Sequence, residues 1–206
     1  MRHKLHTLAI VGLMVFSPSG ALGQNDKLAR AFAQSYSLEA RKDYSNAIAL
    51  LTAANAHPTY ESNLRLGWLC YLGQRYPESL TYYQKAIELM PRSIEPRLGY
   101  VLPASALNRW TDVTVQYNKI LEIDPRNSLV NYRMGLISYN KKDYSNAHQY
   151  LEKVINLYPF DYDSLLLFAW CNYHMGKSRE AQILFNKVLL RSPNDRSALQ
   201  GLSLLK

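Results

Sequence analysis

The sequence predicts an all-α fold in which one helical hairpin is repeated along the chain. Three observations carry this prediction. Proline recurs at a nearly constant interval, at positions 58, 91, 125, 159 and 193. Between the prolines, apolar residues follow helical spacing in two stretches of about 12–14 residues. The motif Lys-Asp-Tyr-Ser-Asn-Ala occurs twice unchanged, at 42–47 and 142–147. A fixed period of this length indicates a solenoid of stacked units.

The chain begins with a segment that we interpret as a secretory signal peptide, residues 1–23. A basic start precedes about twelve largely apolar residues, which are too few to span a bilayer, and small residues before Gly23 suit a signal peptidase. Cleavage there leaves a mature chain of 24–206, periplasmic or secreted and without a membrane span. The alternative is an uncleaved N-terminal anchor. Gln24 stands where a lipoprotein needs cysteine, so a lipid anchor is not expected.

The prolines divide the mature chain into five repeats and a closing helix. Each repeat holds a first helix, a turn, and a second helix that ends near its proline, because proline cannot continue a helix. The expected units are about 28–59, 60–93, 94–127, 128–161 and 162–195, followed by 196–206. Residues that can cap the next helix close four of the units: Ser93, Asn127, Asp161 and Asp195.

In unit 128–161 both helices are expected to contribute residues to the core. They are Val130, Met134, Gly135, Ile137 and Ser138 on the first helix, and Ala147, Tyr150, Leu151, Val154 and Ile155 on the second. Small residues at Gly67, Gly135 and Ala169 allow paired helices to approach closely. Unit 94–127 departs most from the pattern, since Pro103 lies inside its first helix and should kink it.

The closing helix is expected to pack through Leu199 and Leu202, with Ser203 at the small-residue place. Gly201 should weaken this helix by roughly 1 kcal/mol relative to alanine. Two roles stay open for the segment: it caps unit 162–195, or it packs against another molecule and makes a homo-oligomer.

These features resemble the tetratricopeptide repeat (TPR) over about 28–195. The resemblance rests on small residues, aromatics, further small residues and bulky residues that recur in phase: Gly67, Val101, Gly135 and Ala169; Tyr76, Trp110 and Tyr144; Ser79, Val113, Ala147 and Ala181; Tyr83, Tyr117, Leu151 and Phe185. It implies a right-handed superhelix of antiparallel helix pairs, used as a non-catalytic scaffold for a protein or peptide.

The remaining composition argues against several functions. The 24 basic and 16 acidic residues are interspersed, as on a solvated surface, so nucleic-acid binding is not expected. Cys70 and Cys171 stand three units apart, beyond the roughly 7 Å that a disulfide allows, and are expected to be buried thiols. Cys171 and His174 lack further metal ligands. We find no phosphate loop, His-Glu-x-x-His motif or nucleophile elbow, and therefore expect no enzyme, cofactor or metal.

In TPR proteins the second, fifth, ninth and twelfth residues of each unit's first helix face a concave groove. The resemblance therefore proposes partner-binding residues here: Phe32, Tyr36, Leu64, Trp68, Tyr71, Tyr132, Tyr139, Trp170 and Tyr173. The ninth place is not a packing position in this pattern, so Trp68 and Trp170 are read as ligand contacts; the alternative is that both pack on neighbouring first helices. Apolar residues fill the places of the carboxylate clamp of one TPR subclass, so C-terminal carboxylates are not expected partners.

The function expected is to hold a segment of a partner protein in this groove, assisting assembly of a cell-envelope complex. The alternative is binding of a polysaccharide or peptidoglycan strand, because tyrosine and tryptophan faces stack on sugar rings. Reading sugar hydroxyls requires polar residues beside each ring, and the groove offers mainly Glu61, Glu95 and Asp163. A protein partner is therefore the preferred interpretation.

Overall fold

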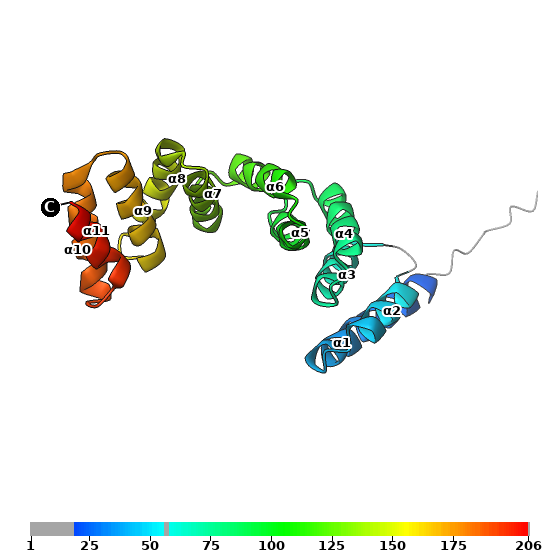
Figure 1. Ribbon diagram of the computed structural model, residues 1–206. Coiled ribbons are helices and arrows are strands. Elements are labelled where there is room, and N and C mark those ends of the chain that lie inside the picture. The colour runs from blue at the N-terminus through cyan, green and yellow to red at the C-terminus, as the bar shows by residue number, and fades with distance from the viewer. Residues whose placement is uncertain (1–18, 56–57, 206) are drawn as a thin grey trace, which may run out of the picture. The chain divides into compact units, whose positions relative to one another are not determined.

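The computed structural model describes residues 19–55 and 58–205, and the regular structure in these residues is entirely helical (Figure 1). The helices fall into two compact units that divide at Pro58 and Thr59. The first unit contains α1 (Ser19–Ala40) and α2 (Tyr44–Ala54). The second contains α3 (Tyr60–Leu72), α4 (Tyr76–Leu89), α5 (Glu95–Ala106), α6 (Trp110–Ile123), α7 (Ser128–Asn140), α8 (Tyr144–Leu157), α9 (Tyr162–His174), α10 (Ser178–Arg191) and α11 (Arg196–Leu204).

Successive helices pair as hairpins, α1 with α2, α3 with α4, and so on to α9 with α10, while α11 packs against α9 and α10. Each hairpin turns through one residue in the left-handed region. These residues recur with the repeat and have φ values of 57–74°: Lys42, Gln74, Asn108, Lys142 and Gly176. The sharp reversal therefore comes from the same backbone geometry each time, although only one of the five is the glycine that this region favours.

Three of the four residues predicted to cap a helix do so in the structure. The side chains of Asn127, Asp161 and Asp195 accept a hydrogen bond from the third backbone N–H of the following helix. The expected cap at Ser93 is wrong, because α5 is preceded by Ile94 and has no side-chain cap. The Ser93 hydroxyl instead lies 2.9 Å from the phenol oxygen of Tyr60. This serine therefore joins two successive first helices.

Glycines let bulky side chains sit directly on a helix backbone. Within their own hairpins, Gly67 faces the Tyr83 ring and Gly135 faces Leu151, so that an added Cβ would lie 3.0 and 2.8 Å from these side chains. This confirms that small residues allow the paired helices to approach.

Two further glycines receive a ring from the preceding hairpin, and we call them glycine sockets. A Cβ on Gly99 would lie 2.2 Å from Tyr83, and one on Gly201 would lie 2.3 Å from Phe185. The closing helix therefore needs the small size of Gly201, because the fully buried Phe185 ring lies against it. Both sockets stand at the same repeat position, where unit 128–161 has Arg133. At that junction α6 packs less closely on α7 than α4 packs on α5.

The expected core residues of unit 128–161 are buried or half-buried. Val130 and Met134 join a buried cluster that begins in α4, and Ala147 and Leu151 join another with Phe168 of α9. The solenoid core is thus continuous from hairpin to hairpin.

Pro103 lies inside a first helix as expected, whereas the end of the second unit departs from the expectation in detail. Pro103 is buried inside α5, and the helix continues to Ala106 beyond it. In α11, Leu202 packs on the final core cluster as expected, whereas Leu199 is 47% exposed and the buried residues are Ala198 and Gly201. The packing face is therefore rotated from the one predicted.

The proposed signal peptide falls mostly on residues 1–18, which lie outside the described residues. Among the helices described, none combines the length and apolar character that crossing a membrane requires.

Candidate binding surface

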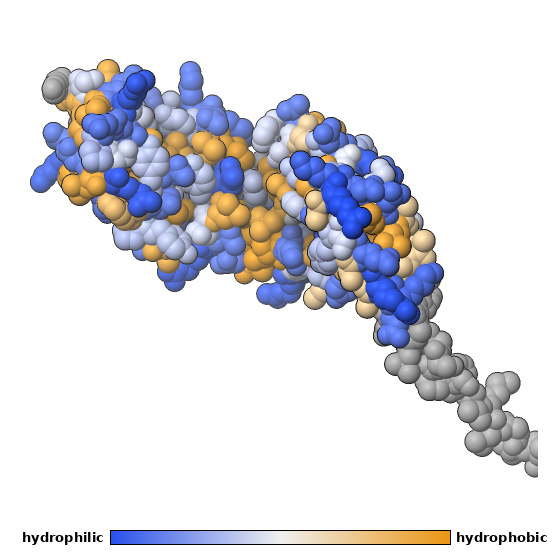
Figure 2. All heavy atoms as spheres, turned by 90° about the horizontal axis from the view of Figure 1, so that it is seen from below, coloured by the Kyte–Doolittle hydropathy of each residue, from blue (hydrophilic) through white to orange (hydrophobic). Residues whose placement is uncertain are grey.

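The candidate residues of the second unit lie on the first helices of the four hairpins. We call the surface made by the second, fifth, ninth and twelfth repeat positions of α3, α5, α7 and α9 the A-helix face. It comprises Glu61, Leu64, Trp68, Tyr71, Glu95, Leu98, Leu102, Ser105, Leu129, Tyr132, Leu136, Tyr139, Asp163, Leu166, Trp170 and Tyr173. Figure 2 views the molecule from the side on which α3, α5 and α7 lie in Figure 1, and it shows hydrophobic residues gathered near the middle.

Leucines make the apolar centre of this face. Leu102 of α5 is 38% exposed and Leu129 of α7 is 49% exposed, while Leu98 and Leu136 are half-buried. The expected residues were mainly aromatic, so Leu102 and Leu129 are the more exposed apolar contacts that sequence reasoning left out of the site. The sequence could have indicated both leucines, because they stand at repeat positions that the TPR pattern assigns to the concave groove.

Trp170 is tied into the fold more firmly than its repeat position suggested. Its indole N–H donates a 2.9 Å hydrogen bond to the hydroxyl of Ser197 in α11, and its ring centroid lies 5.1 Å from that of Phe185. The premise that the ninth place takes no part in packing is therefore wrong here. The geometry supports the alternative, that this ring packs on a neighbouring first helix.

Trp68 stands at the same repeat position in α3 and is half-buried. Its ring centroid lies 5.8 Å from that of Tyr71, which in turn lies 6.0 Å from that of Tyr76. These rings form a line from the middle of α3 to the start of α4. The line leaves part of each ring open to a partner.

A second aromatic cluster joins α7, α8 and α9. The His174 ring stacks on Tyr144 with centroids 4.3 Å apart and planes 10° from parallel, and Tyr139 lies 5.8 Å from the same imidazole. Tyr173 lies 5.2 Å from it on the other side. Burial raises the pKa of the Tyr139 phenol, so this group stays protonated and able to donate a hydrogen bond.

Tyr132 combines burial with a negative surrounding. It packs against the cluster of Ala147, Leu151 and Phe168. Burial raises the pKa of its phenol, the carboxylate of Asp163 adds to that rise, and the charge of Arg133 opposes it. A half-buried hydroxyl here offers a partner one polar contact beside the leucines.

The two remaining candidates, Phe32 and Tyr36, lie on α1 in the first unit. Phe32 is half-buried and Tyr36 is 56% exposed. They form part of the surface of the hairpin α1–α2.

Chemistry-bearing side chains do not converge in the described part of the second unit. Cys70 and Cys171 are fully buried free thiols, and burial raises the pKa of Cys70 to about 11 and that of Cys171 to about 12. Both thiols therefore stay protonated at neutral pH and are poor nucleophiles. Among the described residues, no three histidine, cysteine or acidic side chains group so as to hold a metal ion.

Comparisons with known proteins agree with this architecture. Family models described as tetratricopeptide repeat match residues 30–94 and 139–204. A crystal structure of a tetratricopeptide repeat protein from Parabacteroides merdae is similar with a TM-score of 0.73 at 21% identity, over 87% of this chain and 72% of that one. MamA from Desulfovibrio magneticus RS-1 is similar with a TM-score of 0.67 at 17% identity, over 82% of this chain and 98% of that one.

One curated relative shares a shorter stretch. The uncharacterized protein ycf37 of Cyanophora paradoxa is 28% identical over 72 residues, which make up 35% of this chain and 42% of that protein. The match thus spans less than half of the relative. At these identities the structural likenesses establish the fold.

Proposed function

This chain belongs to the tetratricopeptide repeat family, whose fold serves as a protein-interaction scaffold, and we propose that its A-helix face holds a segment of a partner protein. One observation carries the proposal: Leu102 and Leu129 leave an exposed apolar centre on this face, flanked by the half-buried rings of Trp68 and Trp170. Leucines bind apolar side chains but offer no hydrogen bond to sugar hydroxyls. The centre of the face therefore favours protein over polysaccharide.

We place this activity in the cell envelope, where the scaffold assists assembly of a complex. The support is the sequence of residues 1–23, with its basic start, short apolar run and small residues before Gly23. N-terminal sequencing of the protein from its native host checks the location. The mature chain should begin at or near Gln24, and recovery of intact Met1 from the cytosol would contradict export.

Site-specific photocrosslinking in the native host tests the binding surface. A photoreactive amino acid replaces Leu102 on the A-helix face, and the matched control replaces Val115, which is 48% exposed on α6. We expect a discrete protein adduct from position 102 and none from position 115. Equal adducts from both positions would contradict a specific surface. An adduct that a muramidase removes and a protease leaves intact would favour the polysaccharide alternative.

A further inference from the structure

The charges of the second unit are unevenly distributed. The positions that define the A-helix face contain the carboxylates Glu61, Glu95 and Asp163 and neither lysine nor arginine. All three carboxylates are exposed, in the first turns of α3, α5 and α9. The chain as a whole carries 24 basic and 16 acidic residues and is therefore positively charged. The positions that define this face carry negative charge instead.

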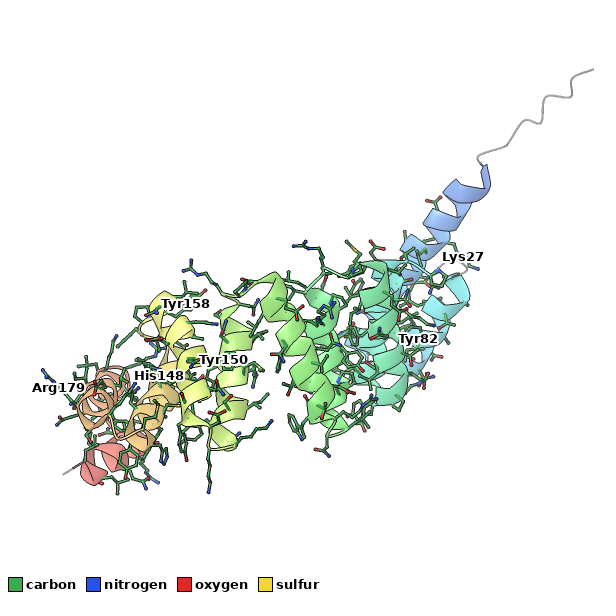
Figure 3. All side chains as sticks on the ribbon, turned by 90° about the horizontal axis from the view of Figure 1, so that it is seen from above. Lys27, Tyr82, His148, Tyr150, Tyr158 and Arg179 are labelled. Atoms are coloured by element: carbon green, nitrogen blue, oxygen red, sulfur yellow. The ribbon has the colours of Figure 1, made fainter. Side chains whose placement is uncertain are left out.

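The arginines of α3 and α5, Arg65 and Arg97, are buried. Arg133 of α7 stands at the glycine-socket position, which faces the preceding hairpin, and its charge acts on the phenol of Tyr117 in α6. On the second helices α4 and α8, Lys85 lies 5.5 Å from the ring centroid of Tyr82, and Lys153 lies 5.7 Å from that of Tyr150; Figure 3 labels both tyrosines. The positions that define the A-helix face thus hold no lysine or arginine, although the charge of Arg133 reaches Tyr132.

The carboxylates also act on the rest of the face. Glu95 accepts a 3.1 Å hydrogen bond from the phenol of Tyr60. This bond holds the Glu95 carboxylate in place on the A-helix face. Beyond burial, the charges of Asp163 and Asp161 are what raise the pKa of Tyr132. A cation on a bound segment would meet these carboxylates and the faces of half-buried aromatic rings, both of which attract it.

We propose that the partner segment is apolar in its centre and carries lysine or arginine on its flanks. This inference rests on the proposed function, because it names the chemistry of the segment that the A-helix face holds. Leucine-type side chains of the segment cover Leu102 and Leu129. Its cations lie against Glu61, Glu95 and Asp163. The same field repels acidic segments, which gives the scaffold a means of selection.

Three synthetic peptides test the proposal with the purified mature protein. Each has leucines in its centre and blocked ends, and the flanks carry lysine in the first, glutamate in the second and serine in the third. Binding is measured by calorimetry at about 0.05 M and about 0.5 M NaCl. We expect the lysine peptide to bind about tenfold or more tightly than the glutamate peptide at low salt, with the serine peptide between them. The preference should shrink at high salt.

Two sets of variants show whether these carboxylates are responsible. The first is Glu61→Gln, Glu95→Gln and Asp163→Asn together, and it should bring the lysine and glutamate peptides close to equal affinity. The matched control is Glu78→Gln, Asp112→Asn and Glu180→Gln, which removes the same number of carboxylates from the first turns of α4, α6 and α10. The control should keep the full preference. Circular dichroism verifies that both sets fold.

The outcomes separate the two proposals. Equal binding of the lysine and glutamate peptides to the unaltered protein overturns the inference about charge and leaves the proposed function standing. A preference that both variant sets lose equally overturns the assignment to this face. Failure of all three peptides to bind overturns the proposed function and the inference with it.

Discussion

The phenol of Tyr162 donates a hydrogen bond to the carboxylate of Asp195, thirty-three residues later. Asp195 in turn caps α11, where it accepts a 2.8 Å bond from the backbone N–H of Ala198. Tyr60 and Ser93 form the equivalent contact between α3 and the segment before α5. At the last junction, a side chain at the start of α9 thus holds the residue that caps the next first helix, α11.

Replacing Tyr162 with phenylalanine should loosen the closing helix. The change removes the hydrogen bond to Asp195 and keeps the ring, and we expect a loss of about 1 kcal/mol in stability. The measurement is urea unfolding together with amide hydrogen exchange in α11. The exposed Tyr158 provides the matched control, since Tyr158→Phe should leave both unchanged. Equal effects of the two variants would contradict the role of the contact.

The same contact should make the closing helix sensitive to acid. The hydrogen bond from Tyr162 lowers the pKa of Asp195 below its ordinary value of 3.8, and backbone N–H donors assist. The carboxylate therefore contributes stability above pH 3.8 that is lost as the pH falls through the lowered pKa. NMR titration of the Asp195 carboxyl checks this. The Tyr162→Phe variant should show a higher pKa, and an unchanged value would show that the phenol does not act on it.

His148 should give a second dependence on pH, at milder acidity. Its ring centroid on α8 lies 4.5 Å from that of Phe168 on α9, and Figure 3 shows where it lies on α8. Burial lowers the imidazole pKa below 6.5, the charge of Lys177 lowers it further, and Glu152 opposes both.

The folded state binds a proton at His148 less readily than the unfolded state does. The contribution of neutral His148 to the free energy of unfolding should therefore be complete above pH 6.5 and should be lost as the pH falls from there through the lowered pKa. Chemical unfolding at a series of pH values measures the slope. His148→Gln should flatten the curve across this window. A variant that keeps the same slope would assign the dependence to another group.

Gly201→Ala should destabilise the protein although alanine favours helices. A Cβ there would lie 2.3 Å from the fully buried Phe185 ring, and overpacking of this kind costs about 1–3 kcal/mol, against a helix-propensity gain of about 1 kcal/mol. Thermal unfolding measures the net effect. Ser203→Ala on the exposed side of α11 is the control and should be neutral or stabilising. Combining Gly201→Ala with Phe185→Leu should recover part of the loss.

The period predicts the helices because proline, caps and apolar spacing all act locally. Asn127, Asp161 and Asp195 could be recognised as caps for that reason. Ser93 could not be excluded, since its hydroxyl is engaged by Tyr60, a residue distant in sequence. The socket at Gly201 could not be predicted for the same reason. Helix propensity is a property of the residue itself, whereas the socket exists only because Phe185 lies opposite.

The repeat register predicts which residues share the candidate surface, and it does not predict how each of them packs. The repeat register places Trp68 and Trp170 at equivalent sites, yet only the structure shows that Ser197 accepts a hydrogen bond from the Trp170 indole. The leucines at 102 and 129 fit the register as well. Their exposure depends on how far the neighbouring side chains reach across each helix, and a period alone does not contain that information.

Arg133 stands at the glycine-socket position between α6 and α7, where the two helices pack less closely than α4 and α5 do. In a linear array of repeats, cooperativity passes only between neighbours, so one weak junction divides the array. Helices α3–α6 and α7–α11 should therefore unfold as two blocks of different stability. Native-state hydrogen exchange would resolve them as separate groups of amides. The second unit would then be a single structure with two melting events, divided between α6 and α7.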